Sequence, residues 1–128
     1  HFNNSELNIL EKIKKINNLI SSHEEKIANP LLEYIHNRKD FNLIGKNKIT
    51  NKDRAPTIAF TVKNKTSKEI SDKLINKNIA TRNDNFYAWR CLKALGIDAN
   101  DGVIRISLVH YNQKNEVDKL ISVLDSIK

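Results

Sequence analysis

Two arginines, Arg82 and Arg105, are the residues of this sequence best suited to bind a ligand. Residues 79–112 have the pattern of a strand, a loop, a helix, a turn and a second strand, and each strand carries one of these arginines. Arginine is scarce, because only five of the 22 Lys and Arg residues are Arg. A guanidinium grips a carboxylate or a phosphate through two hydrogen bonds, which an ammonium does not. Two interpretations stay open here: ligand binding, or pairing with a carboxylate of the same chain.

The residues around these arginines complete a candidate site. The loop 82–87 and the turn at 110–112 lie at predicted strand ends, where binding residues often lie in sheet proteins. Tyrosine phenols, amides and imidazoles there can donate or accept hydrogen bonds. The candidate substrate-binding residues are Arg105, Arg82, Tyr87, Asn85, His110 and Tyr111.

Length and composition narrow the class of protein. A chain of 128 residues fits one domain with its own core. The single cysteine excludes an internal disulfide and predicts a reducing, cytoplasmic location. No apolar run approaches the roughly 20 residues of a membrane span, and no signal peptide is recognisable.

The net charge of +7 raises the alternative of a basic nucleic-acid-binding domain. The excess charge is nearly all lysine and is scattered along the chain. Aromatic residues, which stack on bases, make up only 6%. These features argue against nucleic acid as a partner.

Periodicity predicts the order α, α, β, β, α, β, α, β, α. Two helices run almost without interruption over 5–37, with a disturbance near Ser21 or Pro30, and the strands fall at 41–45, 57–62, from 79, and at 103–109. Further helices are expected at 66–77, at 85–95 and after Asn112. This order predicts an α/β (α+β) two-layer sandwich, with a small, mostly antiparallel sheet and helices on one face. We expect residues 1–40 to be a helical segment packed on a small domain formed by 41–128.

Several local features can be tested against a structure. Capping-box spacing predicts helix starts at Ser22 and Thr66, and Ser5 is a third candidate N-cap. Cys91 has helical spacing with apolar neighbours and is expected in the core. His23 and His36 are expected on the surface, and no metal site is predicted.

Four segments of the sequence resemble one enzyme family. They are Arg54-Ala55-Pro56-Thr57, Phe86-Tyr87-Ala88, the run from Arg105 to Asn112 (RISLVHYN) and Glu116 to Leu120 (EVDKL). Together they resemble the C-terminal small domain of class V aminotransferases, which are fold-type I pyridoxal-phosphate enzymes and include the cysteine desulfurases. The subgroup most similar carries Phe-Tyr-Ala where true desulfurases have the catalytic cysteine.

The resemblance implies roles for individual residues. Arg105 would bind the α-carboxylate of an amino-acid substrate, and Arg82 matches a second arginine of the desulfurase loop. Tyr87 stands at the cysteine position, so persulfide chemistry is not expected, whereas lyase and transaminase chemistry stay open. Asp84 departs from the pattern, because the family usually has Gly there.

The resemblance also implies what lies outside this chain. The Schiff-base lysine and most cofactor ligands of the family belong to a large domain upstream. Because the sequence starts at His1 rather than Met, we expect a piece of a longer polypeptide, and a tag remnant would also explain His1. Since no lysine of this sequence lies in a motif that matches the family's Schiff-base lysine, we expect the chain alone to be inactive, without bound cofactor or catalytic residues of its own. The intact enzyme would be a homodimer that holds pyridoxal 5'-phosphate. A stand-alone module that binds an acidic small molecule is the alternative.

Overall fold

A four-stranded antiparallel sheet organises the protein. The computed structural model describes residues 8–50 and 53–127. The sheet order is β1-β2-β4-β3, and every neighbouring pair is antiparallel. The elements are α1 (Ile9–Asn37), β1 (Phe41–Ile44), β2 (Thr57–Val62), α2 (Ser67–Ile75), β3 (Arg82–Asp84), α3 (Trp89–Ala94), β4 (Val103–Ser107) and α4 (Lys114–Asp125). The predicted α+β sandwich is confirmed.

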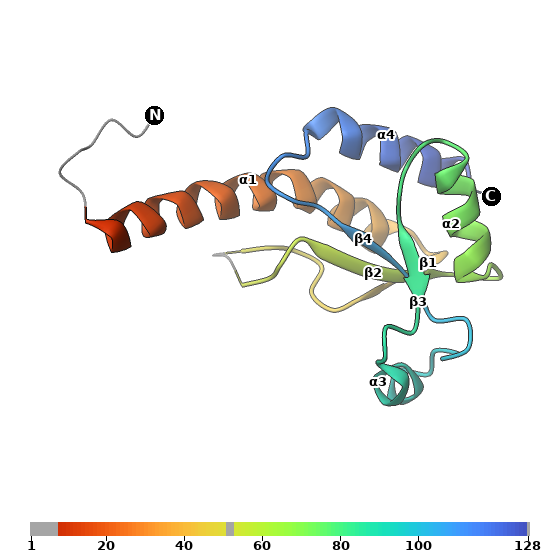
Figure 1. The fold of residues 1–128 in the computed structure, drawn as a ribbon. Helices are drawn as coiled ribbons and strands as arrows, with labels where there is room; N and C mark the ends of the chain where they lie inside the picture. The colour runs from red at the N-terminus through yellow and green to blue at the C-terminus, as the bar shows by residue number, and fades with distance from the viewer. Residues whose placement is uncertain (1–7, 51–52, 128) are drawn as a thin grey trace.

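Three helices cover one face of the sheet, and one helix lies on the other. Figure 1 shows α1, α2 and α4 above the strands and α3 below them. Side chains of a strand alternate between the two faces, so Ile58 and Phe60 of β2 and Ile104 and Ile106 of β4 point to the three-helix side, where they are buried. The intervening residues of β2 and β4 face the side that α3 only partly covers.

The first helix is longer and less buried than the sequence pattern indicates. It runs unbroken through Pro30, and its capping box is formed by Asn8 and Glu11. The predicted helix start at Ser22 is wrong, because residue 22 lies inside this helix. The proposed N-cap Ser5 lies outside the described residues.

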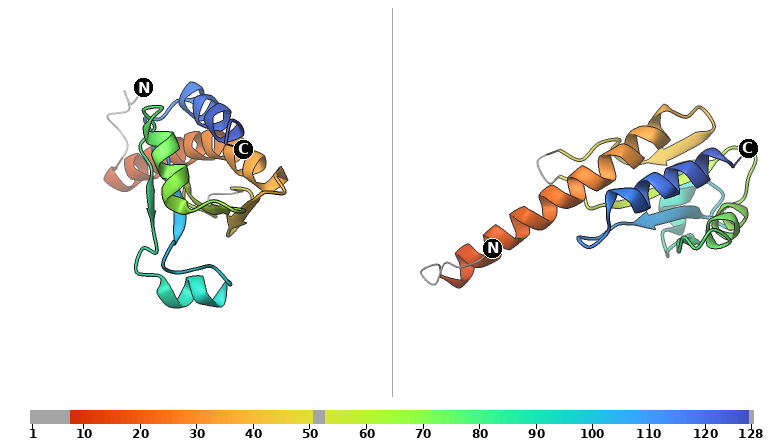
Figure 2. Two further views of the ribbon diagram at one scale, coloured as in Figure 1. Left: turned by 90° about the vertical axis from the view of Figure 1, so that its right-hand side faces the viewer. Right: turned by 90° about the horizontal axis from the view of Figure 1, so that it is seen from above.

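Only the second half of α1 belongs to the core. Its buried residues are Ile27, Ala28, Leu31, Leu32 and Ile35. The first half projects away from the sheet, as the right-hand view of Figure 2 shows. Its apolar side chains are exposed, namely Ile9, Leu10, Ile13, Ile16 and Leu19.

The helix boundaries around α2 agree with the sequence. Thr66 is the N-cap, and its hydroxyl accepts a hydrogen bond from the backbone N–H of Glu69 at 3.2 Å. The Glu69 carboxylate accepts one in return from the Thr66 N–H at 2.7 Å. Beyond the end of α2, Asn78 takes the left-handed conformation with φ 58°.

Other boundaries differ from expectation. The third strand begins at Arg82 rather than at Ile79, and the last strand ends at Ser107. Helix α4 has Gln113 as its N-cap, because the Asn112 side chain instead accepts a hydrogen bond from the backbone N–H of Val109. Cys91 is exposed, so its predicted core position is wrong.

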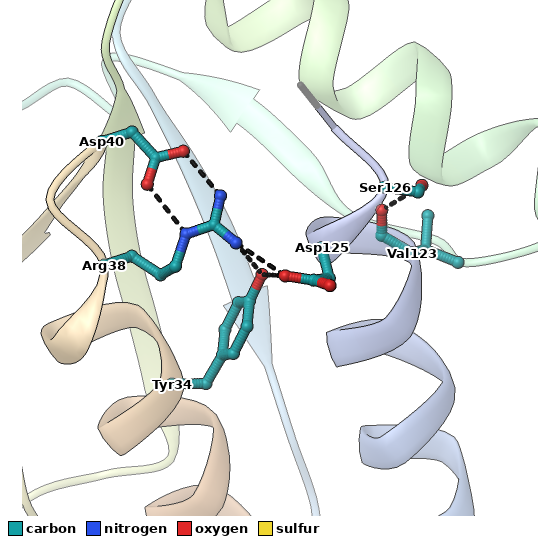
Figure 3. Close-up of polar contacts among 6 residues, drawn as sticks. All are labelled: Tyr34, Arg38, Asp40, Val123, Asp125 and Ser126. Atoms are coloured by element: carbon teal, nitrogen blue, oxygen red, sulfur yellow. Dashed lines mark hydrogen bonds and ion pairs between the residues drawn. The ribbon is translucent and has the colours of Figure 1, made fainter.

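The end of α1 is joined to the end of α4 by Arg38. Figure 3 shows its guanidinium between Asp40 and Asp125, with N···O distances of 2.7 and 2.6 Å. The guanidinium carbon also lies 5.2 Å from the centre of the Phe41 ring. This contact fixes the helical layer over β1, at the edge of the sheet away from β3.

The capping carboxylates should make stability depend on pH. The backbone N–H of Thr66 lowers the pKa of Glu69 from its ordinary value of 4.5. A lowered folded-state pKa adds stability above the ordinary value, and this stability is lost as the pH falls. We expect urea unfolding midpoints at pH 7 and pH 3 to differ less for Glu69→Gln than for the wild type, because the amide keeps an acceptor but does not titrate. Equal pH dependence in both proteins would contradict this.

Candidate arginine site on the open sheet face

Arg82 and Arg105 lie directly opposite each other on neighbouring strands. They are partners in the antiparallel register of β3 and β4. Side chains paired in this way have Cβ atoms about 4.5–5.5 Å apart, and like charges in such a pair destabilise a sheet. Arg105 alternates with Ile104 and Ile106, which face the core, so both arginines lie on the face away from α1, α2 and α4. The sheet therefore places two positive charges close together, and their repulsion destabilises the folded protein.

Neither arginine is neutralised by a carboxylate within the described part of the chain. The ion pairs found there involve Arg38, Lys46, Lys68 and Lys114. The Asp84 carboxylate, two residues from Arg82 in the sequence, accepts a hydrogen bond from the backbone N–H of Asn85 at 2.6 Å. Pairing within residues 8–50 and 53–127 therefore does not explain these two arginines.

Arg105 has one nitrogen that is closed off. Its Nε is buried and has no hydrogen-bond partner, a state shared within the described residues only by Nη1 of Arg54. Burial lowers the pKa of Arg54, whose Nη2 donates to the carbonyl of Thr57 at 3.3 Å. A buried donor without a partner is rare in native proteins and is destabilising. Arg105 thus combines a buried donor that lacks a partner with a positive charge that no carboxylate of the described residues neutralises.

An aromatic ring covers the Arg105 guanidinium. Its Cζ lies 4.0 Å from the centre of the Phe86 ring, a cation–π contact. Phe86 also packs against a second, smaller core on this face, formed by Leu92, Ala99 and Val103. In the sequence, Phe86 stands out only as part of the Phe-Tyr-Ala motif, which predicts no role for the Phe86 side chain. The sequence feature that could have indicated this contact is an aromatic residue in the loop between the two arginines.

Phe86 and the following residue form a backbone elbow. Phe86 and Tyr87 have φ values of 51° and 59°, in the left-handed region that non-glycine residues seldom adopt. This conformation is why the predicted helix 85–95 begins only at Trp89. Two consecutive residues of this kind store strain that the surroundings must overcome.

Asn85 and Gly102 hold the elbow in place. The Asn85 side chain accepts a hydrogen bond from the Tyr87 N–H at 3.0 Å and donates one to the Ala99 carbonyl at 3.3 Å. A Cβ on Gly102 would lie 2.3 Å from the carbonyl atoms of Asp84, so the turn before β4 packs directly on this loop. Asn85, a candidate for substrate contact, therefore also builds the loop.

The elbow presents Tyr87 to solvent, with its side chain fully exposed (104%). The other predicted site residues lie elsewhere. His110 and Tyr111 are exposed in the turn beyond the end of β4, with ring centres 5.4 Å apart, whereas the elbow contacts the turn before β4. The structure thus brings Arg82, Arg105, Phe86 and Asn85 together near the start of β4. It places His110 and Tyr111 beyond the other end of β4.

A cleft of the described structure lies away from the arginines. It has a volume of about 290 Å³ and is formed between α4, the end of β4 and the segment before β3. Neither Arg82 nor Arg105 lines it. The arginines instead lie on the sheet face opposite to α1, α2 and α4.

Other kinds of site find no support in residues 8–50 and 53–127. No three His, Cys, Asp or Glu side chains gather there as metal ligands. His36 is exposed, whereas His23 is half-buried and bonds the Asn112 carbonyl at 2.8 Å, which ties α1 to the loop before α4. Among these residues no helix has the length and apolar character needed to cross a bilayer.

Comparison with known proteins identifies the family of this α+β domain. The family model described as aminotransferase class-V matches residues 5–120. The aminotransferase-like protein FGM3 of Gibberella zeae is 30% identical over 118 residues, which cover 91% of this chain and 29% of that protein. The chain therefore belongs to the class-V aminotransferase family.

Solved structures show the same fold. A cysteine desulfurase from Thermococcus onnurineus matches with a TM-score of 0.76 and 23% identity, over 92% of this chain and 28% of that one. The Escherichia coli cysteine desulfurase CsdA matches with a TM-score of 0.66 and 24% identity, over 83% and 24%. The chain thus spans less than a third of the length of these relatives.

Proposed function

We propose that this chain is the C-terminal part of a pyridoxal-phosphate-dependent class-V enzyme and that Arg105 binds the α-carboxylate of an amino-acid substrate. The observation that carries the proposal is the Arg82–Arg105 pair, which has no carboxylate partner among the described residues. Two adjacent guanidinium groups repel each other and destabilise a protein, whereas an anion bound between them offsets this repulsion. A substrate carboxylate is such an anion.

The two arginines would have different tasks. Arg105 is half-buried and its orientation is set by the Phe86 ring, which suits a clamp that defines ligand geometry. Arg82 is exposed and its side chain forms no ion pair with a carboxylate among the described residues, so it would raise the positive potential and attract the anion. The exposed phenol of Tyr87 would contact the substrate once the rest of the enzyme covers this face. Tyr87 cannot form a persulfide, so we propose transaminase or lyase chemistry.

The cofactor would be held by another part of the polypeptide. Pyridoxal phosphate supplies an electron sink and is carried on a lysine in such enzymes. Within the described residues every lysine is exposed except Lys65, which is half-exposed. None offers the enclosed position that a Schiff-base lysine needs, so the described residues do not fit the cofactor by themselves. The chain alone is therefore proposed to be inactive.

The exposed first half of α1 is a second observation in favour of a longer polypeptide with a further domain. Its exposed stripe of Ile9, Ile13 and Ile16 is 42–70% accessible, and an apolar helix face normally packs on another surface. We propose the large cofactor-binding domain of the same polypeptide as its partner, within a cytoplasmic homodimer.

Cofactor titration of two proteins tests this proposal. Full-length protein and the isolated 128-residue chain would be mixed with pyridoxal phosphate, and the absorbance of lysine-bound cofactor recorded. Only the full-length protein should give a band that disappears on mutation of one lysine upstream of His1. A lysine-dependent band in the isolated chain would contradict the proposal. Carboxylate binding by the isolated chain, without any cofactor effect on the full-length protein, would favour the stand-alone acid-binding module.

A further inference from the structure

We propose that Phe86 is a positioning residue that makes Arg105 grip its carboxylate end-on, through the two terminal nitrogens alone. This inference rests on the proposed role of Arg105 and adds how the ligand must approach. It starts from two observations on one side chain: the ring of Phe86 lies against the guanidinium at 4.0 Å, and the Nε of Arg105 is buried without a partner.

A guanidinium offers a carboxylate two bidentate edges. One edge consists of Nε and one terminal nitrogen, and the other consists of both terminal nitrogens. Since the Nε of Arg105 is inaccessible, the first edge is closed to a ligand. Only the end-on edge remains, so the substrate carboxylate must lie in the guanidinium plane beyond the tip of the side chain.

The Phe86 ring also offsets a charge problem. Arg82 stands opposite Arg105 and repels it, and a flexible side chain would respond by swinging into solvent. The negative face of an aromatic ring attracts a cation and holds the guanidinium where the elbow puts it. The ring is itself fixed, because Phe86 packs against Leu92, Ala99 and Val103 and its backbone is held by the Asn85 hydrogen bonds.

Fluorination of the ring tests the contact without changing its shape appreciably. In full-length, cofactor-loaded protein, residue 86 would be Phe, 4-fluoro-, 3,5-difluoro- or pentafluorophenylalanine, with Phe86→Leu as the variant that lacks a ring. The probe is L-alanine, an amino acid with one carboxylate, and its Kd is measured by calorimetry. We expect Kd to rise steadily with fluorine number, about three- to tenfold over the series. A flat series would overturn the inference, because a purely structural ring would not respond to its electron density.

Two further measurements separate this inference from the proposed function. If Arg105→Met leaves the Kd for L-alanine unchanged, the proposed function fails, and the inference fails with it. If Arg105→Met weakens binding but the fluorinated series is flat, only the role of Phe86 is wrong. Without ligand, the NMR signal of the Arg105 Nε–H should show slow solvent exchange and an upfield ring-current shift that Phe86→Leu removes. An unshifted signal in the wild type would also overturn the inference.

Discussion

Replacing Arg105 with methionine in the full-length enzyme is expected to lower kcat/KM for its amino-acid substrate by roughly 30- to 1000-fold. Methionine keeps the length and the apolar stem of the side chain but removes the charge. Losing one partner of a hydrogen-bonded charge pair costs about 2–4 kcal/mol, and each 1.4 kcal/mol is a factor of ten. Because the carboxylate is held in both the bound substrate and the transition state, most of the loss should appear as a higher KM.

Two variants serve as controls for this result. Arg105→Lys should restore only part of the affinity, because an ammonium keeps the charge but cannot form the planar double hydrogen bond. Arg82→Met should lower kcat/KM less than Arg105→Met does. The loss should become smaller as salt is added, because salt screens an exposed charge that acts on the substrate at long range. Steady-state kinetics at low and high salt measure both. Equal losses for Arg82→Met and Arg105→Met would contradict the division of roles between the two strands.

Replacing Gly102 with alanine is expected to destabilise the protein by about 3 kcal/mol and to weaken ligand binding as well. The new Cβ would lie 2.3 Å from the carbonyl carbon and oxygen of Asp84 and 2.7 Å from the backbone nitrogen of Asn85. Backbone atoms cannot yield as a flexible side chain can, and φ of +75° adds strain of its own. The elbow must therefore move, and it carries Phe86 away from Arg105.

Gly96→Ala is the matched control for this prediction. Gly96 has nearly the same φ, +71°, but a Cβ there would meet nothing within 4 Å. Only the conformational strain applies, about 1–2 kcal/mol, and substrate affinity should stay at the wild-type value. Urea unfolding gives the stabilities and calorimetry gives the affinities. A loss of affinity in Gly96→Ala, or none in Gly102→Ala, would contradict the proposed support of the elbow.

Local sequence rules account for much of the fold. The alternation of apolar residues over 57–62 predicted a strand, and the alternate residues Ile58, Phe60 and Val62 are buried there. Thr66 and Glu69 predicted the start of α2 because each completes a hydrogen bond with the other's backbone. These features depend on residues close together in the chain.

The elbow could not be predicted from such rules. The pattern of its residues favours a right-handed helix and predicts a helix start at residue 85, whereas α3 begins at Trp89. The conformation instead depends on Ala99 and Gly102, which are distant in sequence and hold Asn85 and Asp84 from the other side. The core position predicted for Cys91 was wrong because helical periodicity does not show which face of a helix is covered: Leu92 is the buried residue of α3, and Cys91 is exposed.

The arginine pair could be predicted only in part from the sequence. The sequence identified both residues as unusual but left their pairing partner open. Strand register, which local sequence does not specify, put Arg82 opposite Arg105, and the loop put Asp84 in contact with the Asn85 backbone rather than with Arg82. The resemblance to the family suggested the role proposed for Arg105, whereas the Phe86 contact required the structure.

The most direct test of the central claim is a crystal structure of the full-length, cofactor-loaded enzyme with L-alanine bound. We predict the α-carboxylate about 2.7–2.9 Å from both terminal nitrogens of Arg105, with Phe86 stacked on the guanidinium and Nε free of ligand contacts. A carboxylate held by other residues, with Arg105 paired to a protein carboxylate, would contradict the account.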